Sequence, residues 1–172
     1  MPISLHAAVV PSWLQILEAG RGWLDKVAAS PMAEAELVEA RLTEDMLPFP
    51  YQVRSMADHS QGAIEALREG VFRPKFDAAL PASIAEMRDK LASASAFLGH
   101  LDPAELESFI GRPMRFEIGA KRLDFTAEDF LLSFSQPNFY FHATTAYGIL
   151  RHNGVAVGKL DYLGKLRMHV TG

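Results

Sequence analysis

Four polar side chains form one stripe on an otherwise apolar segment near the end of the sequence: Ser135, Asn138, His142 and Thr145. Their spacing of three or four residues places them on one face of a helix that turns by about 100° per residue. The other faces of this segment carry mostly aromatic and aliphatic residues. Because a buried polar group without a partner costs on the order of 1–3 kcal/mol, the stripe must meet polar partners, water or a ligand.

A second histidine, His59, lies in an earlier helical segment. On the same wheel it falls at the edge of the apolar face, with Gln52 and Ser55 beside it. Sites in helix bundles are commonly assembled from side chains on facing helices. We therefore expect one small-molecule pocket between the two segments, with these ligand-binding residues: His59, Asn138, His142, Gln52, Ser55 and Thr145.

Both histidines also have a purely structural interpretation. A histidine on an apolar face is commonly a core residue whose hydrogen bonds are satisfied within the protein. The chain is then a non-catalytic bundle that binds a ligand or a partner, or an oligomeric scaffold. If His142 only fills the core, replacing it with leucine leaves the stability level or raises it. For a site built for a ligand, we expect His142→Leu to be neutral or stabilising in the metal-free protein and to abolish stabilisation by added divalent metal.

Hydrophobic periodicity predicts four long helices, over residues 4–29, 50–69, 81–99 and 126–152. Ser4 and Thr126 are suited to cap two of the helix starts, and Gly70 and Gly154 to end two of the helices. Pro137 lies inside the last helix and is expected to bend it.

Apolar residues surround the whole circumference of the last helix, so we expect it to be the central, fully buried helix of the bundle. Alternating residues over 114–118 and 122–125 predict a short β-hairpin that packs on the bundle. Residues 31–48 are predicted to be a connection with a short helix. The predicted fold class is all-α: a single domain over residues 1–172, formed by a four-helix bundle with a β-hairpin before the last long helix.

Composition and charge exclude several classes of function. The 172 residues include no cysteine, which excludes disulfides, thiolate metal ligands and a cysteine nucleophile. No phosphate-binding loop and no His-Glu-x-x-His or Gly-x-Ser-x-Gly motif occurs. The net charge of −4 argues against nucleic-acid binding, and the basic residues from Lys159 to His169 are interpreted as a solvated end.

Partners and location are expected from the same composition. The sequence shows no signal peptide and no apolar run of the ~18 residues that a membrane span needs, so we expect a soluble, cytoplasmic protein without membrane contact. A high apolar content and the apolar tail residues predict a twofold homodimer. These tail residues are Val155, Val157, Leu160, Tyr162 and Leu163.

Residues 137–155 read PNFYFHATTAYGILRHNGV, and residues 158–164 read GKLDYLG. Together with Asp58-His59 and Pro74-Lys75-Phe76, these runs resemble a bacterial family of domains of unknown function. That family is grouped with the DinB/YfiT-like superfamily, and the resemblance extends over nearly the whole chain. It implies a DinB/YfiT-like four-helix bundle.

Superfamily members with a complete site bind a divalent metal through three histidines, one on the second helix and two on the last long helix. The resemblance assigns His59 to the first position and His142 to the last, while Asn138 stands where the remaining histidine is expected. It therefore implies a zinc or nickel site at His59, His142 and Asn138, in which one of the three histidine ligands is missing. Some superfamily members transfer low-molecular-weight thiols or act as hydrolases, but for this chain a reaction does not follow.

If these positions share one water molecule or ion, the imidazoles of His59 and His142 must lie within about 8 Å of each other, given ligand bonds of ~2.1 Å.

Overall fold

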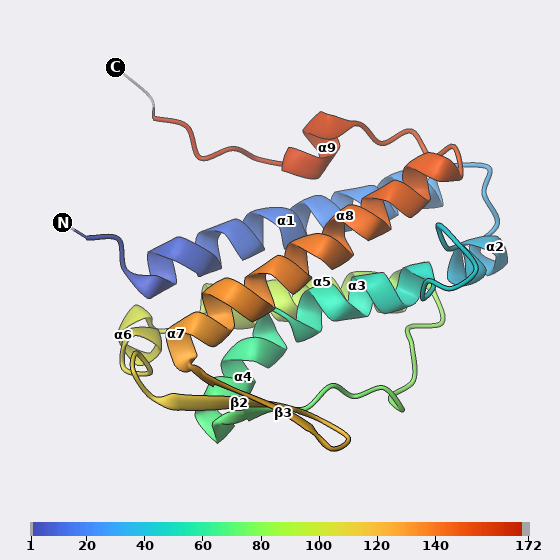
Figure 1. The fold of residues 1–172 in the computed structure, drawn as a ribbon. Helices are drawn as coiled ribbons and strands as arrows, with labels where there is room; N and C mark the ends of the chain where they lie inside the picture. Colours follow the sequence, from blue (N-terminus) through green and yellow to red (C-terminus); the bar gives the residue numbers. More distant parts are fainter. Residues whose placement is uncertain (1, 170–172) are drawn as a thin grey trace.

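The four long helical segments lie side by side. The computed structural model describes residues 2–169. The bundle consists of α1 (Leu5–Ala28), α3 (Phe49–Asp58) followed by α4 (Gln61–Glu69), α5 (Ile84–Gly99) and α8 (Gln136–His152) (Figure 1). Both α1 and α3 contact α5 and α8, so the four helices enclose one core. The predicted four-helix bundle is confirmed.

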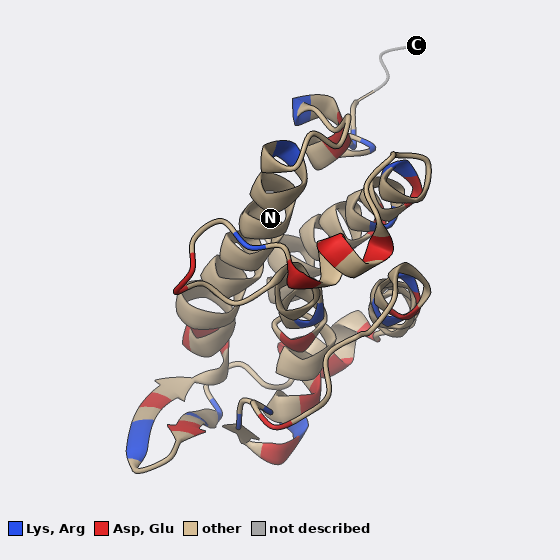
Figure 2. Cartoon of the chain, turned by 90° about the vertical axis from the view of Figure 1, so that its right-hand side faces the viewer, with Lys and Arg blue, Asp and Glu red and all other residues tan. Residues whose placement is uncertain are grey.

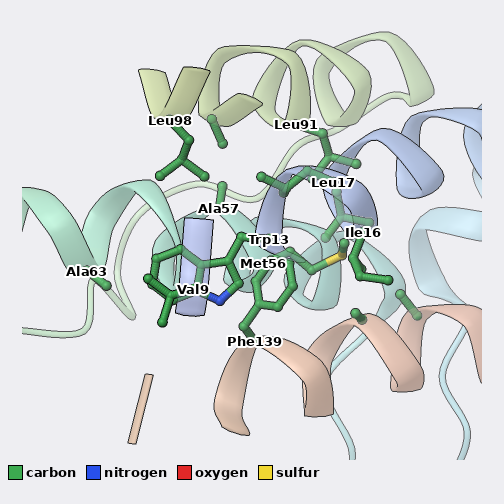
Figure 3. Packing of buried hydrophobic residues seen from close by; sticks show 14 of the residues in the cluster. Val9, Trp13, Ile16, Leu17, Met56, Ala57, Ala63, Leu91, Leu98 and Phe139 are labelled. Atoms are coloured by element: carbon green, nitrogen blue, oxygen red, sulfur yellow. The ribbon is translucent and has the colours of Figure 1, made fainter. Parts of the chain in front are cut away.

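Large apolar side chains fill this core. Figure 3 shows Trp13, Met56 and Phe139, from α1, α3 and α8, next to one another. All three are fully buried. Gly20 allows the helices to approach closely, because a Cβ at this position would lie 3.0 Å from Leu91 Cδ1 of α5 and 3.3 Å from Met56 Cε.

The helix ends lie at the capping residues that the sequence predicts. The Ser4 hydroxyl accepts a hydrogen bond from the main-chain N–H of Ala7 at the start of α1. Thr126 accepts in the same way from the N–H of Asp129. Gly70 ends α4 with a φ of 74°, and Gly154 follows α8 with a φ of 76°. These left-handed conformations favour glycine.

The helix predicted over residues 50–69 is two helices, with a break at His59 and Ser60. The Ser60 hydroxyl donates to the main-chain carbonyls of Met56, over 2.7 Å, and Ala57, over 3.3 Å. Serine side chains that bond to preceding carbonyls in this way compete with the continuation of a helix. His59 therefore occupies the C-terminal cap of α3 instead of the middle of a longer helix.

The last helix changes type along its length. It begins as α7 (Ala127–Asp129), continues as the π-helical segment η1 (Phe130–Ser135) and becomes α8. Pro137 lies in the first turn of α8, where its missing N–H is tolerated. The expectation that this helix is central and buried on all sides is wrong, because Leu132 is 46% and Phe141 55% exposed. Solvent covers one face, and the apolar residues there do not reach the core.

A three-stranded sheet lies at one end of the bundle. β2 (Pro113–Ile118) and β3 (Lys121–Thr126) form the predicted antiparallel hairpin. Met114 and Phe116 are its buried residues, which matches the alternation in the sequence. β1 (Val71–Phe72) pairs in parallel with β2 and was not predicted, because two residues are too short to show a period.

The shorter elements connect the bundle helices. α2 (Glu34–Glu39) is the short helix expected within residues 31–48, whereas α6 (Pro103–Glu107) and α9 (Lys159–Leu163) were not predicted. α5 begins later than Pro81, because the Ser83 hydroxyl caps it by accepting a hydrogen bond from the N–H of Glu86.

The basic end is not simply solvated, as the sequence had suggested. Within α9 the main-chain carbonyl of Asp161 accepts a hydrogen bond from Trp23 Nε1 over 2.9 Å. Tyr162 stacks on the Trp23 ring at a centroid distance of 5.7 Å. Through these contacts α9 packs against α1, above which it lies in Figure 1.

Charged residues are interspersed along the elements in the view of Figure 2. Over residues 2–169, none of the helices combines the length and apolarity that crossing a membrane requires.

Candidate functional site

His59 and His142 lie face to face between α3 and α8. Their ring centroids are 5.7 Å apart and their planes differ by 14°. On its other side the His59 ring stacks on Phe72, at 5.3 Å, and the edge of Phe134 lies 5.9 Å away. The two imidazoles are therefore well within the reach of a single ion.

His142 is oriented by Gln52. The amide nitrogen of Gln52 donates to the main-chain carbonyl of Leu47 over 2.8 Å, so its oxygen faces the histidine. That oxygen lies 2.7 Å from His142 Nδ1, which must be the protonated nitrogen because an amide oxygen only accepts. The neutral ring then carries its lone pair on Nε2.

The same reasoning assigns the proton of His59. The Ser135 hydroxyl donates to the main-chain carbonyl of His59 over 3.0 Å. Its oxygen also lies 3.4 Å from His59 Nδ1, and because its hydrogen is already used, it can only accept from that nitrogen. This contact is longer than the ~2.9 Å of a good N–H···O bond, so it favours a proton on His59 Nδ1 and a lone pair on Nε2 less strongly than Gln52 does for His142.

Burial keeps both rings neutral. Desolvation lowers the pKa of His59 to about 3, with a smaller contribution from the nearby His142. Desolvation likewise lowers the pKa of His142 to about 4. Low-dielectric surroundings disfavour the charged imidazolium, so at neutral pH the site offers two uncharged nitrogen donors.

The remaining predicted residues are less directly engaged. Asn138 Nδ2 donates to the main-chain carbonyl of Phe134, one helical turn earlier, over 2.7 Å. Its amide oxygen is consequently the atom left for a ligand. Ser55 and Thr145 are buried. In the described chain none of these three side chains hydrogen-bonds to either imidazole.

The histidine set itself is incomplete. Across residues 2–169 no three or more histidines and carboxylates gather where they could hold a metal ion. This agrees with asparagine at position 138, where the family resemblance leads one to expect a histidine.

A cleft of about 380 Å3 adjoins the pair. His59, Ser55 and Tyr51 line it, whereas His142 does not. The Tyr51 ring lies edge-on to His142, with ring centroids 5.8 Å apart. The wall also includes Asp58. Burial raises the pKa of the Asp58 carboxyl, and the charges of Lys90, Arg54 and Lys75 oppose that rise.

Sequence reasoning missed Tyr51, Phe72 and Arg54 as parts of the site. Arg54 stands three residues after Tyr51 and four residues before Asp58, and this helical spacing was the available signal for Tyr51 and Arg54. Phe72 gave no signal, because its position depends on the unpredicted pairing of β1 with β2.

Comparisons with known proteins agree with this architecture. The sequence model of the family "Domain of unknown function (DUF1993)" matches residues 5–163. The crystal structure of a DinB family member protein from Shewanella denitrificans superimposes with a TM-score of 0.77 and 28% sequence identity, over 97% of this chain and 96% of that chain. The fold is thus DinB-like. Among curated proteins, none matches the sequence significantly.

Proposed function

The chain belongs to the DUF1993 family, and we propose that it binds a divalent metal ion weakly at His59 and His142, as part of a small-molecule site. The supporting observation is the shared tautomer of the two imidazoles. Each ring uses its Nδ1 proton inside the protein, toward Gln52 or Ser135, and each keeps an Nε2 lone pair. Metal-binding histidines are typically oriented by such a hydrogen bond on the other ring nitrogen.

The donor set fits a metal that prefers imidazole. Zinc and nickel favour such ligands. The ring centroids of His59 and His142 lie 5.7 Å apart, but their planes are within 14° of parallel. Because each lone pair lies in its own ring plane, at least one ring would have to turn for both Nε2 atoms to hold the same ion. The Asn138 amide oxygen is the candidate third donor, and it is a weaker ligand than the imidazole it replaces.

The residues of this site would have different roles. His59 and His142 would hold the ion, Gln52 and Ser135 would fix their rings, and the ion would act as a Lewis acid with open positions for water. Ser55 and Thr145 would complete the polar lining. No reaction is assigned to the chain.

A second candidate function is metal-free ligand binding with structural histidines. The hydrogen bond between Ser135 and the His59 carbonyl favours it, because this bond satisfies a carbonyl left free by the break between α3 and α4. The Gln52–His142 bond likewise needs no metal.

Elemental analysis separates the two candidates. Protein purified without a histidine tag is dialysed to equilibrium against millimolar zinc, nickel or manganese, and the bound metal is measured as the excess inside the dialysis bag. We expect about one zinc or nickel ion per chain and much less manganese, because manganese prefers oxygen ligands. Zinc and nickel contents far below one ion per chain would favour the metal-free candidate.

A further inference from the structure

A buried guanidinium lies in the wall of the cleft. The Arg54 side chain is only 7% exposed and lines the cleft. Its Nη1 donates to the main-chain carbonyl of Ala78 over 2.8 Å, and its Cζ lies 4.9 Å from the centre of the Tyr51 ring. These contacts hold the guanidinium between α3 and the loop that follows β1.

Part of this guanidinium is not paired. Within residues 2–169 the Arg54 Nε–H finds no hydrogen-bond acceptor. The Asp58 carboxylate oxygen Oδ2 is 3.5 Å from it, which is longer than the ~2.9 Å of a good N–H···O bond. A guanidinium has five N–H donors in a planar fork, and a buried charge without full pairing is destabilising. The Nε atom itself is out of reach of solvent, so an incoming carboxylate would meet the guanidinium at its terminal nitrogens.

Charges of both signs line the cleft. Its cations are Arg54, Arg73, Lys75 and Lys90, and its carboxylates are Asp58, Glu65 and Glu69. Arg73 is paired with Glu117, with an N···O distance of 2.7 Å, so Arg54, Lys75 and Lys90 are the cations left to attract an anion. Of the three carboxylates, Glu65 already accepts a hydrogen bond from Gln61 over 2.7 Å.

Part of the wall is apolar. Phe72, Pro74 and Phe76 line the cleft, and Phe76 is 54% exposed. Pockets that combine an apolar wall with a few placed polar groups are typical of small-molecule sites. A molecule that fills this cleft needs an apolar body and one charged end.

We propose that the cleft binds small organic acids, with the carboxylate on Arg54 and the apolar body against Phe72 and Phe76. Lys75 and Lys90 strengthen the attraction at the rim. This binding goes beyond the metal site and does not depend on it, since His59 contributes only part of the wall.

Calorimetry on metal-free protein in the presence of EDTA tests this binding. The probes are phenylacetate and hexanoate, each with its uncharged amide as the matched comparison. Both acids are expected to bind saturably with one site per chain, and the amides at least about tenfold more weakly, because charge-assisted hydrogen bonds are lost. Failure of both acids to bind, or equal binding of acids and amides, would overturn the proposal.

Two variants locate the site. Arg54→Gln should weaken binding of phenylacetate about tenfold or more, but it also removes the bond that holds Ala78. Gly62→Leu avoids that problem. A Cβ at Gly62, on the cleft wall, meets only Ala57 O and Asp58 Cβ, both at 3.9 Å, so the leucine fits the helix and its end takes up cleft volume.

The matched control is Gly22→Leu in α1, where a Cβ meets nothing within 4 Å. We expect Gly62→Leu to abolish phenylacetate binding and Gly22→Leu to leave it unchanged. Phenylacetate binding that survives in Gly62→Leu would place the acid elsewhere and contradict the proposal. Zinc titrations without any acid report on His59 and His142 separately, so either binding activity can fail without the other.

Discussion

The Ser135 hydroxyl donates its hydrogen to the main-chain carbonyl of His59 over 3.0 Å, where α3 has ended and α4 has not begun. Ser135 is itself the last residue of the π-helical segment η1. Two irregular stretches of backbone thus meet at one hydrogen bond. π-Helical segments are frequent at functional sites, and here the irregular turn brings a hydroxyl to the histidine.

Replacing Ser135 with alanine should destabilise the protein by about 1–3 kcal/mol, because it leaves the His59 carbonyl without its partner in a buried place. Urea unfolding measures this loss. Ser133→Ala is the matched control, since Ser133 is exposed and bonds only within its own helix, to Asp129. An equal effect of the two substitutions would contradict the role given to Ser135.

His142→Leu should also lower the free energy of unfolding by about 1–3 kcal/mol, because it leaves the buried amide oxygen of Gln52 without a hydrogen-bond partner. This differs from the neutral or stabilising effect expected from the sequence, because the Gln52 oxygen lies 2.7 Å from His142 Nδ1 and would lose that partner. In a double-mutant cycle with Gln52→Leu, the double variant should be less destabilised than the sum of the single variants, by about 1–2 kcal/mol. Strict additivity would show that the two side chains do not support each other.

The lowered pKa values make stability depend on pH. His59 and His142 have folded-state pKa values of about 3 and about 4, below the unfolded value of about 6.5. As the pH falls from 6.5 toward 4, these histidines become protonated in the unfolded chain while they stay neutral in the folded protein. The free energy of unfolding therefore decreases. Above pH 6.5 this contribution to stability is fully present.

Between pH 7 and pH 5 each histidine should lower the free energy of unfolding by about 2 kcal/mol. His59→Phe keeps an aromatic ring in the stack and removes the titrating group. In EDTA, the free energy of unfolding of this variant should fall by about 2 kcal/mol less than that of the wild type between pH 7 and pH 5. Urea unfolding at both pH values measures the difference. Parallel losses in the two proteins would mean that His59 titrates normally.

A twofold dimer stays a prediction, but not all of the apolar tail residues are available for it. Val155 and Val157 are buried in the core, while Leu160 is 80% exposed. The exposed Phe141 on α8 adds to the apolar surface. Light scattering at micromolar concentration should give twice the monomer mass, and a monomeric mass would remove the prediction. The cytoplasmic location is likewise a prediction from the sequence.

Helix ends were predictable at Ser4, Gly70 and Gly154, but the start of α5 was not, because Ser83 caps it two residues after the predicted start. Helical periodicity also identified His59 and His142 as inward residues, and the two rings do face each other. The break at Ser60 was not predictable, because the periodicity of α3 and α4 continues across it and a tertiary bond from Ser135 supports it. The residues of the cleft wall were not predictable either, because Phe72 is positioned there by the pairing of β1 with β2, which are distant in the sequence.

Titration of zinc into metal-free, untagged protein, followed by calorimetry, measures binding at His59 and His142 most directly. We predict one site per chain in the wild type, no binding in His59→Phe, and unchanged binding in His100→Ala, which removes an exposed histidine elsewhere. Weak binding is expected because Asn138 replaces an imidazole. Equal zinc binding by the wild type and His59→Phe, or no zinc binding by the wild type at millimolar concentrations, would contradict a metal site at the two histidines.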